Sequence, residues 1–340
     1  MIAHAWRSAF TLVEILVSIM IFGIVSIALI TILLICTNLF RAGEYSRAST
    51  DEVIAALGTL DNDLKRLVPG RDGGFFFSQI TDTVAGAAPG ALSPRGNCAV
   101  AFKITNPDRG QIDSSGRKAR LIVLYWVGGP TANDEYLYRD TEVAADSDGN
   151  PATVNELDVV NTIIARADSP VIARRCLHLG VWISTLDNRR LLAANNPVDQ
   201  SDWTQGRAGA TLPVEPTAPT IVDPIYCTEA TGPLPTDAAK GFPDALRFTV
   251  TLANGRYAPK GYVIQDNGGD IKVAGLGALP VVPGSMVRID NEWIAYDAYD
   301  SGTIKASATR TARRSTAATH LRNDPVWLGQ TFSLVRIFPK

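Results

Sequence analysis

The sequence has little histidine or cysteine, and no excess of charge of either sign. It contains 3 His and 4 Cys among 340 residues, and its formal net charge is −2. Proteins that bind nucleic acid usually carry a strongly basic face, so this balance gives no reason to expect a nucleic-acid partner. No two cysteines are spaced as CxxC, which leaves zinc ribbons and thioredoxin-like redox motifs without support.

Sequence motifs of the large enzyme families are missing as well. There is no GxSxG nucleophile elbow, no HExxH zinc motif and no P-loop. Gly275 and Gly277 lack the third glycine of a dinucleotide fingerprint, so we interpret them as loop residues. We predict that His178 is a core or edge residue of a strand and that His320 makes a structural hydrogen bond. We therefore expect no catalytic residues.

Oxygen-bearing side chains at alternate positions form a candidate metal site. Asp146, Asp148 and Asn150 would offer oxygen ligands as at the start of a calcium loop. Pro151 and Leu157 stand where an EF-hand has its glycine and its glutamate, so a surface turn rich in Asp and Asn is favoured. We expect no cofactor, with calcium as the open alternative.

The cysteines allow a disulfide without selecting one. Cys36 lies in an apolar run, whereas Cys98, Cys176 and Cys227 lie far apart in the polar body. In an oxidising compartment, two of these three could form one disulfide. Three free buried thiols is the alternative, and the sequence does not decide between them.

The sequence has one long run of apolar residues, which lies near its N-terminus. The stretch from Ile15 to Phe40 contains no charged residue and is dominated by Ile, Leu and Val. A membrane-spanning helix needs about 20 such residues, so we predict a transmembrane helix over 15–40. The apolar region of a secretory signal peptide is shorter, about 7–15 residues, so we expect this segment to remain as an anchor.

The helix is predicted to continue beyond the apolar stretch. Leucines recur there at three- and four-residue spacing with charged residues between them, which indicates an amphipathic helix. Pro69 and Gly70 then end the pattern. We predict one helix over 10–68, whose second half packs on a soluble domain. The stripe consists of Leu57, Leu60, Leu64 and Leu67.

The segment from Ser8 to Val17 reads Ser-Ala-Phe-Thr-Leu-Val-Glu-Ile-Leu-Val. It resembles the processing site of type IV prepilins and pseudopilins, in which a short leader precedes Phe-Thr-Leu-x-Glu and a long apolar helix. The resemblance implies that a prepilin peptidase removes leader residues 1–9 by cutting between Ala9 and Phe10. It also implies methylation of the new amine on Phe10 and places Glu14 fifth in the mature chain.

Glu14 is a carboxylate in the first turns of the predicted span. Such a group is costly in lipid, so it is usually paired or placed for function. In the family that the segment resembles, the carboxylate of one subunit can neutralise the N-terminal amine of its neighbour. Pairing of Glu14 with the Phe10 amine would then reward correct docking of subunits. The alternative is that Glu14 only lies at the headgroup boundary.

Beyond residue 69 the pattern changes from helix to strand. The run over 120–127, rich in β-branched and aromatic residues, predicts a buried strand, and a Gly-Gly-Pro turn predicts a hairpin between it and 135–139. The runs over 181–185 and 245–252 alternate apolar and polar residues, which predicts half-buried strands. The stretch 187–243 is rich in Asn, Asp, Pro, Thr and Gly, and we predict a long irregular excursion there. The predicted strands cover 120–127, 135–139, 181–185 and 245–252.

Short motifs in the body add a finer resemblance. The order of an Asp-Leu-x-Arg segment, a Leu-Tyr-Arg strand, a loop tryptophan and a Pro-x-Ala-Leu-Arg strand is similar to that of J-type minor pseudopilins of type II secretion. The corresponding residues here are Asp63–Arg66, Leu137–Arg139, Trp203 and Pro243–Arg247.

Residues 254–327 have no counterpart in the order of motifs that resembles J-type pseudopilins. The strand 287–296, with its Glu-Trp-Ile, and the loop from Thr316 to His320 resemble a small β module of phage-structural and surface proteins. The last strand, within 328–340, is predicted to return to the main sheet. The module would then be an insertion into the body, which covers 69–253.

Together these observations predict a pilin-like α+β fold: a long N-terminal helix, transmembrane and then amphipathic, on an antiparallel sheet with an inserted β module. The resemblance implies a minor pseudopilin at or near the tip of a type II secretion filament. Its partners would be other pilins, the prepilin peptidase and the inner membrane, with a single span and the body in the periplasm or another extracytoplasmic space. The alternative is a minor pilin of a type IV pilus, acting as an adhesin or in DNA uptake. A membrane-tethered enzyme ranks third.

Overall fold

The computed structural model divides the chain into two compact units, Met1–Ala48 and Ser49–Lys340, which are described separately. The boundary between them falls within the first helix. The structure describes residues 12–70, 74–80, 97–105, 120–128, 135–144, 156–164, 166, 168–184, 225–227, 242–253, 260–277, 279, 281, 285–290, 292–306 and 318–338.

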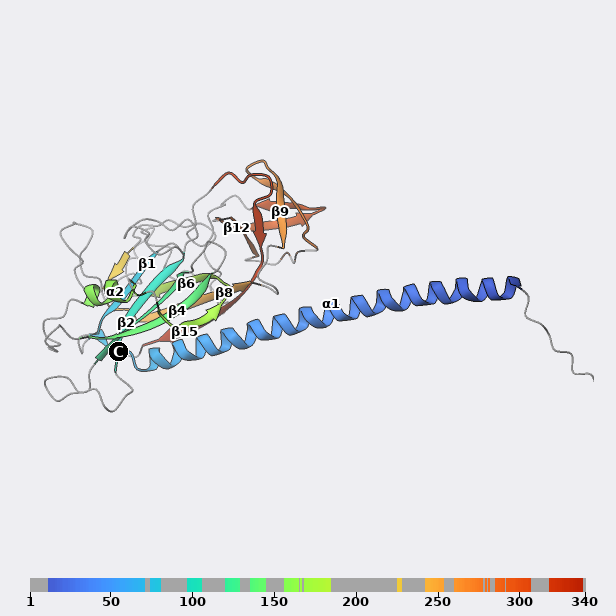
Figure 1. Cartoon of the computed structure of the whole chain (residues 1–340). Helices are drawn as coiled ribbons and strands as arrows, with labels where there is room; N and C mark the ends of the chain where they lie inside the picture. The colour runs from blue at the N-terminus through green and yellow to red at the C-terminus, as the bar shows by residue number, and fades with distance from the viewer. Residues whose placement is uncertain are drawn as a thin grey trace, which may run out of the picture. The chain divides into compact units, whose positions relative to one another are not determined.

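Helix α1, Leu12–Lys65, contributes to both units and confirms the prediction of one long N-terminal helix (Figure 1). Leu, Ile and Ala favour the helix throughout its length. It ends before Pro69, which has no amide hydrogen and disfavours helical backbone in the residue before it. The chain then enters a sheet at once, because Leu67 forms a bridge with Ile104 and the amide of Val68 donates to the carbonyl of Lys103.

In the second unit, the largest sheet has six antiparallel strands in the order β5-β4-β3-β2-β1-β7. The predicted hairpin between the first two strong strands is confirmed, since β3 and β4 pair over eight residues. The strands are β1 Phe76–Ile80, β2 Cys98–Thr105, β3 Arg120–Gly128, β4 Tyr136–Val143, β5 Val171–Arg174 and β7 Ile225–Cys227.

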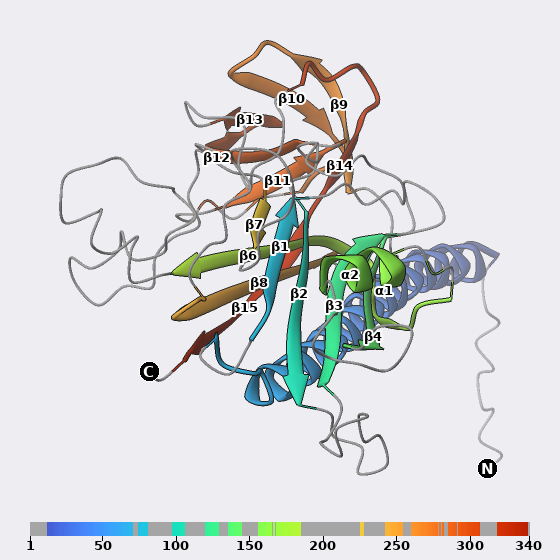
Figure 2. The same cartoon turned by 90° about the vertical axis from the view of Figure 1, so that its left-hand side faces the viewer.

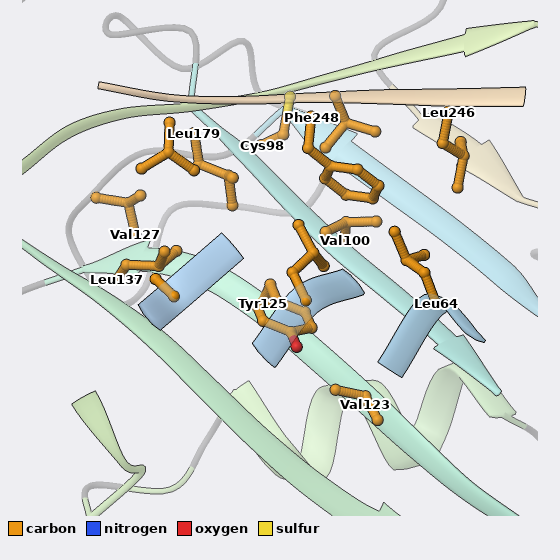
Figure 3. Packing of buried hydrophobic residues seen from close by; sticks show 14 of the residues in the cluster. Leu64, Cys98, Val100, Val123, Tyr125, Val127, Leu137, Leu179, Leu246 and Phe248 are labelled. Carbon is orange, nitrogen blue, oxygen red and sulfur yellow. The ribbon is translucent and has the colours of Figure 1, made fainter. Parts of the chain in front are cut away.

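A second antiparallel sheet has the order β15-β8-β6, formed by β6 Cys176–Ser184, β8 Ala245–Ala253 and β15 Gly329–Ile337. Side chains from both sheets and from the end of α1 form one core. Figure 3 shows Leu64 and Phe248 within this cluster. Leu60 and Leu64 of the leucine stripe are buried in it, and Leu57 and Leu67 pack against it partly buried. The prediction that the stripe packs on the sheet is confirmed.

The opposite face of the six-stranded sheet carries a second core under helix α2, Glu156–Ile164. Val160 and Ile163 of α2 lie buried against side chains of β1, β2 and β3. Glu156 begins the helix and pairs with the buried Lys103 of β2. Because helices cover both faces, β2 is buried over all but its last residue.

The predicted insertion, residues 254–327, contains a closed antiparallel barrel with the strand order β10-β13-β12-β11-β14-β9 (Figure 2). Apolar side chains fill its interior, among them Val287, Ile294 and Val326. Gly268 and Gly302 adopt positive φ in its tight turns, a conformation that costs glycine little. The strands are β9 Gly261–Asp266, β10 Asp270–Ala274, β11 Met286–Ile289, β12 Glu292–Asp300, β13 Thr303–Ala306 and β14 Pro325–Trp327.

The barrel lies in the chain between two neighbouring strands of one sheet. β8 precedes it and β15 follows it, and the two pair without interruption from Gly329–Ala253 to Ile337–Ala245. The terminal strand was predicted to return to the main sheet. It does return to the body beside the strand that precedes the barrel, but it joins the three-stranded sheet and not the larger six-stranded one. A closed barrel was not predicted, because the residue pattern of a strand does not show which strand it pairs with.

Two expectations about the body are wrong. The strands over 181–185 and 245–252 were expected to be half-buried, yet Trp182, Thr249 and Thr251 on the second face are buried too. Threonine is β-branched and fits a buried strand, so its hydroxyl is a poor indicator of exposure. The excursion 187–243 is not irregular throughout, since it contains β7, a short strand that adds to the edge of β1.

Candidate functional site

The first part of α1 is the chain's most distinct surface. From Leu12 to Arg41, 30 residues form a helix that is long and apolar enough to cross a membrane. Its large apolar side chains are exposed within the first unit, including Leu16, Phe22 and Phe40. Exposed apolar surface of this extent is typical of a surface that is covered by lipid or by another protein. By its length and composition, the helix is compatible with a transmembrane segment.

Polar side chains within this span are satisfied by the helix itself. The hydroxyls of Ser18, Thr31 and Thr37 donate to backbone carbonyls four residues earlier, at 2.7, 2.8 and 2.7 Å. In lipid, each polar group must find its partner within the protein, and these bonds meet that need. Glu14 is the one charged side chain within Leu12–Phe40, lying exposed in the first turn of α1.

Several predicted site residues lie outside the described part of the chain. These are the processing residues Ala9 and Phe10 and the calcium candidates Asp146, Asp148 and Asn150. Within the described ranges, no group of three or more His, Cys, Asp and Glu side chains could hold a metal ion.

The cysteines whose side chains the structure describes form no disulfide with one another. Cys36 is exposed on the apolar part of α1, while Cys98 and Cys176 are buried in the body. Cys98 and Cys176 therefore do not pair with each other. Burial raises the pKa of the Cys176 thiol, with the nearby carboxylate of Glu135 acting in the same direction. Cys176 is accordingly a protonated core residue.

The end of α1 is fixed to the sheet by a buried polar cluster. Asp63 of α1 accepts from Arg139 of β4, with Nε to Oδ2 at 2.7 Å and Nη2 to Oδ1 at 3.1 Å. The hydroxyl of Tyr125 on β3 also donates to Asp63 Oδ2, at 2.5 Å. Asp63 and Arg139 come from the Asp-Leu-x-Arg and Leu-Tyr-Arg segments that the sequence singled out separately. The structure joins them in one two-pronged ion pair.

The surroundings of Tyr125 make this cluster sensitive to alkali. Burial raises the pKa of Tyr125 well above its usual value, and the adjacent charge of Asp63 raises it further. In the unfolded state the Tyr125 hydroxyl loses its proton above about pH 10, whereas in the folded state it keeps that proton. Raising the pH above that value therefore favours the unfolded state. The cluster's contribution to stability is therefore complete below that pH and declines above it.

We expect the Tyr125→Phe variant to lose part of this alkaline sensitivity. Above about pH 10 the wild-type free energy of unfolding should fall, and Tyr125 alone accounts for up to about 1.4 kcal/mol per pH unit. The variant loses a hydrogen bond worth about 1 kcal/mol at neutral pH. Urea unfolding of both proteins across this range measures the two slopes. Equal slopes would show that Tyr125 ionises freely in the folded protein.

A second buried ion pair joins the barrel to the body. Nη1 of Arg288 on β11 lies 3.0 and 2.7 Å from the carboxylate oxygens of Glu135, and it also donates to the carbonyl of Leu177 at 3.3 Å. The ring of Trp327 lies 5.5 Å from the guanidinium carbon. An apolar cluster surrounds the pair, formed by Leu177, Ala253, Trp293, Ala295 and Trp327.

The two histidines of the body are buried, and His320 makes the hydrogen bond that was predicted for it. His178 is buried on β6 with the ring of Trp293 at its edge, 5.7 Å between centroids. Nε2 of His320 lies 3.1 Å from Oε2 of the buried Glu292. The amide of Ala318 donates to the same oxygen at 2.9 Å. Glu292 thus ties the segment before β14 to the barrel wall.

No family model matches the chain, and no curated protein or solved structure matches it. Its own residues are therefore the only basis for a functional proposal, and α1 with its exposed and buried parts is the feature that bears on it most directly.

Proposed function

We propose that the chain is a membrane-anchored minor pseudopilin of a type II secretion filament, a structural subunit rather than an enzyme. One observation carries the proposal. From Leu12 to Arg41, α1 is exposed and apolar enough to cross a membrane, and further along the same helix Leu60 and Leu64 are buried against an antiparallel sheet. A helix with an anchor half and a packed half resembles the plan of pilins. The Phe-Thr-Leu-x-Glu segment at its start has the same resemblance.

Glu14 gives this anchor a role in assembly. A carboxylate inside an apolar span has a large free-energy penalty unless a cation neutralises it. Cleavage before Phe10 would create such a cation at the mature N-terminus, four residues away. In an array of parallel helices, the amine of one subunit can pair with Glu14 of the next. The pairing favours a single register between neighbours.

The barrel supports a place at or near the tip. Residues of β9 to β14 form a closed module inserted between adjacent strands β8 and β15. A module of this bulk is difficult to repeat at every step of a tightly packed helical filament. A subunit at the end of the filament meets no such restriction. The body would lie in the periplasm and the anchor in the inner membrane.

Mass spectrometry of the mature protein tests the first step of this proposal. We expect the chain to begin at Phe10 with a methylated amine, after removal of residues 1–9 by a prepilin peptidase. The same preparation would show whether the anchor is retained. A protein that still begins at Met1 in assembled filaments would contradict the proposal.

Glu14→Ala is expected to leave insertion intact and to reduce incorporation into filaments by about tenfold or more. A loss of about 1.4 kcal/mol in docking already corresponds to a factor of ten. Membrane fractionation measures insertion, and cross-linking to neighbouring pilins measures incorporation. Glu44→Ala is the matched control, because Glu44 is an exposed carboxylate of α1 beyond the apolar part. Equal incorporation of both variants would rule out the pairing role.

The self-contained barrel favours one alternative, a minor pilin of a type IV pilus whose barrel serves as an adhesin or in DNA uptake. A strain without the gene separates the two. Loss of protein secretion with intact adhesion and transformation supports the pseudopilin. The reverse pattern supports the pilus subunit.

A further inference from the structure

The three-stranded sheet ends in β15, whose outer edge has no partner strand among the described residues. β15 pairs with β8 on one side from Gly329 to Ile337, and it is the last member of the strand order. An unpaired strand edge presents a row of amide and carbonyl groups to which another strand can bind. The outer edge of β15 is therefore a candidate interaction surface.

Alternate residues of β15 present their backbone groups to this open edge. In an antiparallel pair, the amide and carbonyl of one residue point toward the partner strand and those of the next residue point away. The amide of Phe338 donates to the carbonyl of Asp244 in the register of β8 and β15, so the even-numbered residues of β15 are bonded to β8. The amides and carbonyls of Ser333, Val335 and Ile337 then point outward. Within the described part of the chain, none of these three residues has a hydrogen bond at that edge.

The other described edges of the two sheets are covered or short. At the β6 edge, the outward amide of Leu179 donates to the side chain of Asn97 at 3.0 Å. At the β5 edge, the outward amide of Arg174 donates to the carboxylate of Glu52 on α1. β7, at the remaining edge, has only 3 residues. Among the described strands of the sheets, β15 is thus the one long edge that is left open.

The open edge also lacks the features that usually protect an edge strand, which are charge, proline and bulges. β15 contains no proline, and its pairing with β8 runs without a bulge. Its one charged residue, Arg336, contacts Asp61 of α1 at 3.7 Å and has its backbone bonded to β8. Ser333 and Ile337 are exposed and uncharged, and Ile337 exposes 67% of its surface. A long, uncharged edge of this kind favours pairing with another strand.

We propose that β15 receives an extended segment of a different protein, which adds to the three-stranded sheet as a new edge strand. The segment would pair with the amides and carbonyls of Ser333, Val335 and Ile337, whose spacing another strand matches. It would be free of proline, which has no amide to donate, and uncharged, because these three residues offer no counter-charge. In the proposed filament the donor is a neighbouring pilin-like subunit, and in this respect alone the inference rests on the proposed function.

A second copy of the chain does not suit this edge. Two β15 edges in antiparallel pairing would be related by a two-fold axis perpendicular to the sheet, which reverses every direction within the sheet plane. The stripe from Leu57 to Leu67 packs on the core along its length, so this part of α1 lies along the sheet. The two α1 helices would then run in opposite directions, whereas subunits anchored in one membrane need them to run in the same direction. The donor is therefore a different polypeptide.

Photo-cross-linking of the full chain in membranes tests the proposal. The Ile337→p-benzoylphenylalanine variant carries a photoreactive group at the open edge. We expect illumination to join this position to an extended segment of one other protein, identified by mass spectrometry of the linked peptide. The same group at Val171, which is 44% exposed on β5, is the position control and should not give that adduct.

Val335→Pro separates strand pairing from mere proximity. Proline removes the outward amide of Val335 and leaves the bonds to β8 in place, so the fold should be kept while the edge is blocked. The yield of the adduct at Ile337 should fall by about tenfold or more. Val335→Ala is the matched control, because it shortens the same side chain and keeps the amide, and it should retain the adduct. Ser333→Lys, which places a charge on the edge without changing the backbone, should give the same loss as the proline, and circular dichroism checks that each variant is folded.

Three results would overturn the proposal: no discrete adduct at Ile337, an adduct to a second copy of the chain, or an adduct whose yield is unchanged in both Val335→Pro and Ser333→Lys. An adduct to a protein that is not a pilin, if both substitutions reduce it, would support strand addition and count against the filament function. A mature chain that begins at Phe10 but gives no adduct would have the opposite meaning. The two ideas therefore fail separately.

Discussion

Asp63→Ala is expected to lower the free energy of unfolding by about 3–5 kcal/mol, the usual loss when one partner of a buried ion pair is removed. The Asp63 side chain is 4% exposed, and its carboxylate is shared by Arg139 and Tyr125. Without it, the guanidinium of Arg139, whose side chain is 26% exposed, keeps much of its burial and loses its counter-charge. Urea unfolding of the full chain in detergent, followed by tryptophan fluorescence, measures the change.

Asp61→Ala is the matched control for this experiment. Asp61 lies on the same helix two residues earlier and contacts Lys65 at 2.6 Å and Arg336 at 3.7 Å. These pairs are solvent-accessible, so their loss should be worth about 1 kcal/mol or less. Similar losses for the two variants would show that burial of the Asp63 cluster does not govern its contribution.

The Asp63 cluster fixes the orientation of α1 on the sheet. The leucines of the stripe select which face of the helix is buried, but apolar contacts are not directional and leave small rotations of that face unrestricted. A two-pronged pair between Asp63 and Arg139 has only one satisfactory geometry. Whatever the anchor half of α1 contacts in a membrane, the packed half therefore presents a defined face to the β3 and β4 strands.

The sequence was sufficient for the elements with long regular patterns. The apolar run and the leucine stripe predicted α1, and the β-branched run over 120–127 predicted β3. The sequence did not predict α2 or β7, which have 9 and 3 residues. Helices this short are marginal without tertiary contacts, and a three-residue strand has no periodicity to detect. Packing on the sheet decides both.

The candidate sites follow the same division. Glu14 and the leucine stripe could be found from local patterns. Glu14 is recognised by the apolar residues next to it in the sequence, and the stripe by the spacing of its leucines. The partners Asp63 and Arg139 were noted in separate motifs, but 76 residues separate them and only the fold brings them together. Glu135 and Arg288 are 153 residues apart in different modules, and no local pattern predicts how a barrel docks.

Arg288→Met is expected to destabilise the second unit by about 3–5 kcal/mol, because it removes the guanidinium that neutralises the buried Glu135 carboxylate. Both side chains are almost fully buried, at 2% and 1% exposed. Glu135→Gln should be destabilising for the converse reason, since the charge of Arg288 then stays buried. The double variant removes both charges, so neither site is left with a buried charge that has no partner. It should therefore be more stable than the Arg288→Met variant.

The double-mutant cycle distinguishes an ion pair from two independent packing contacts. Coupling between the sites should be about 1–3 kcal/mol, whereas independent sites would give additive losses.

Thermal unfolding adds a second readout. In the wild type, the pair and the cluster around Trp293 join barrel and body, so the second unit should unfold in one transition. In the Arg288→Met variant the joint is weakened, and the barrel, which has its own core around Val287 and Ile294, should unfold separately. Additive losses with a single transition in every variant would mean that apolar contacts alone hold the barrel in place.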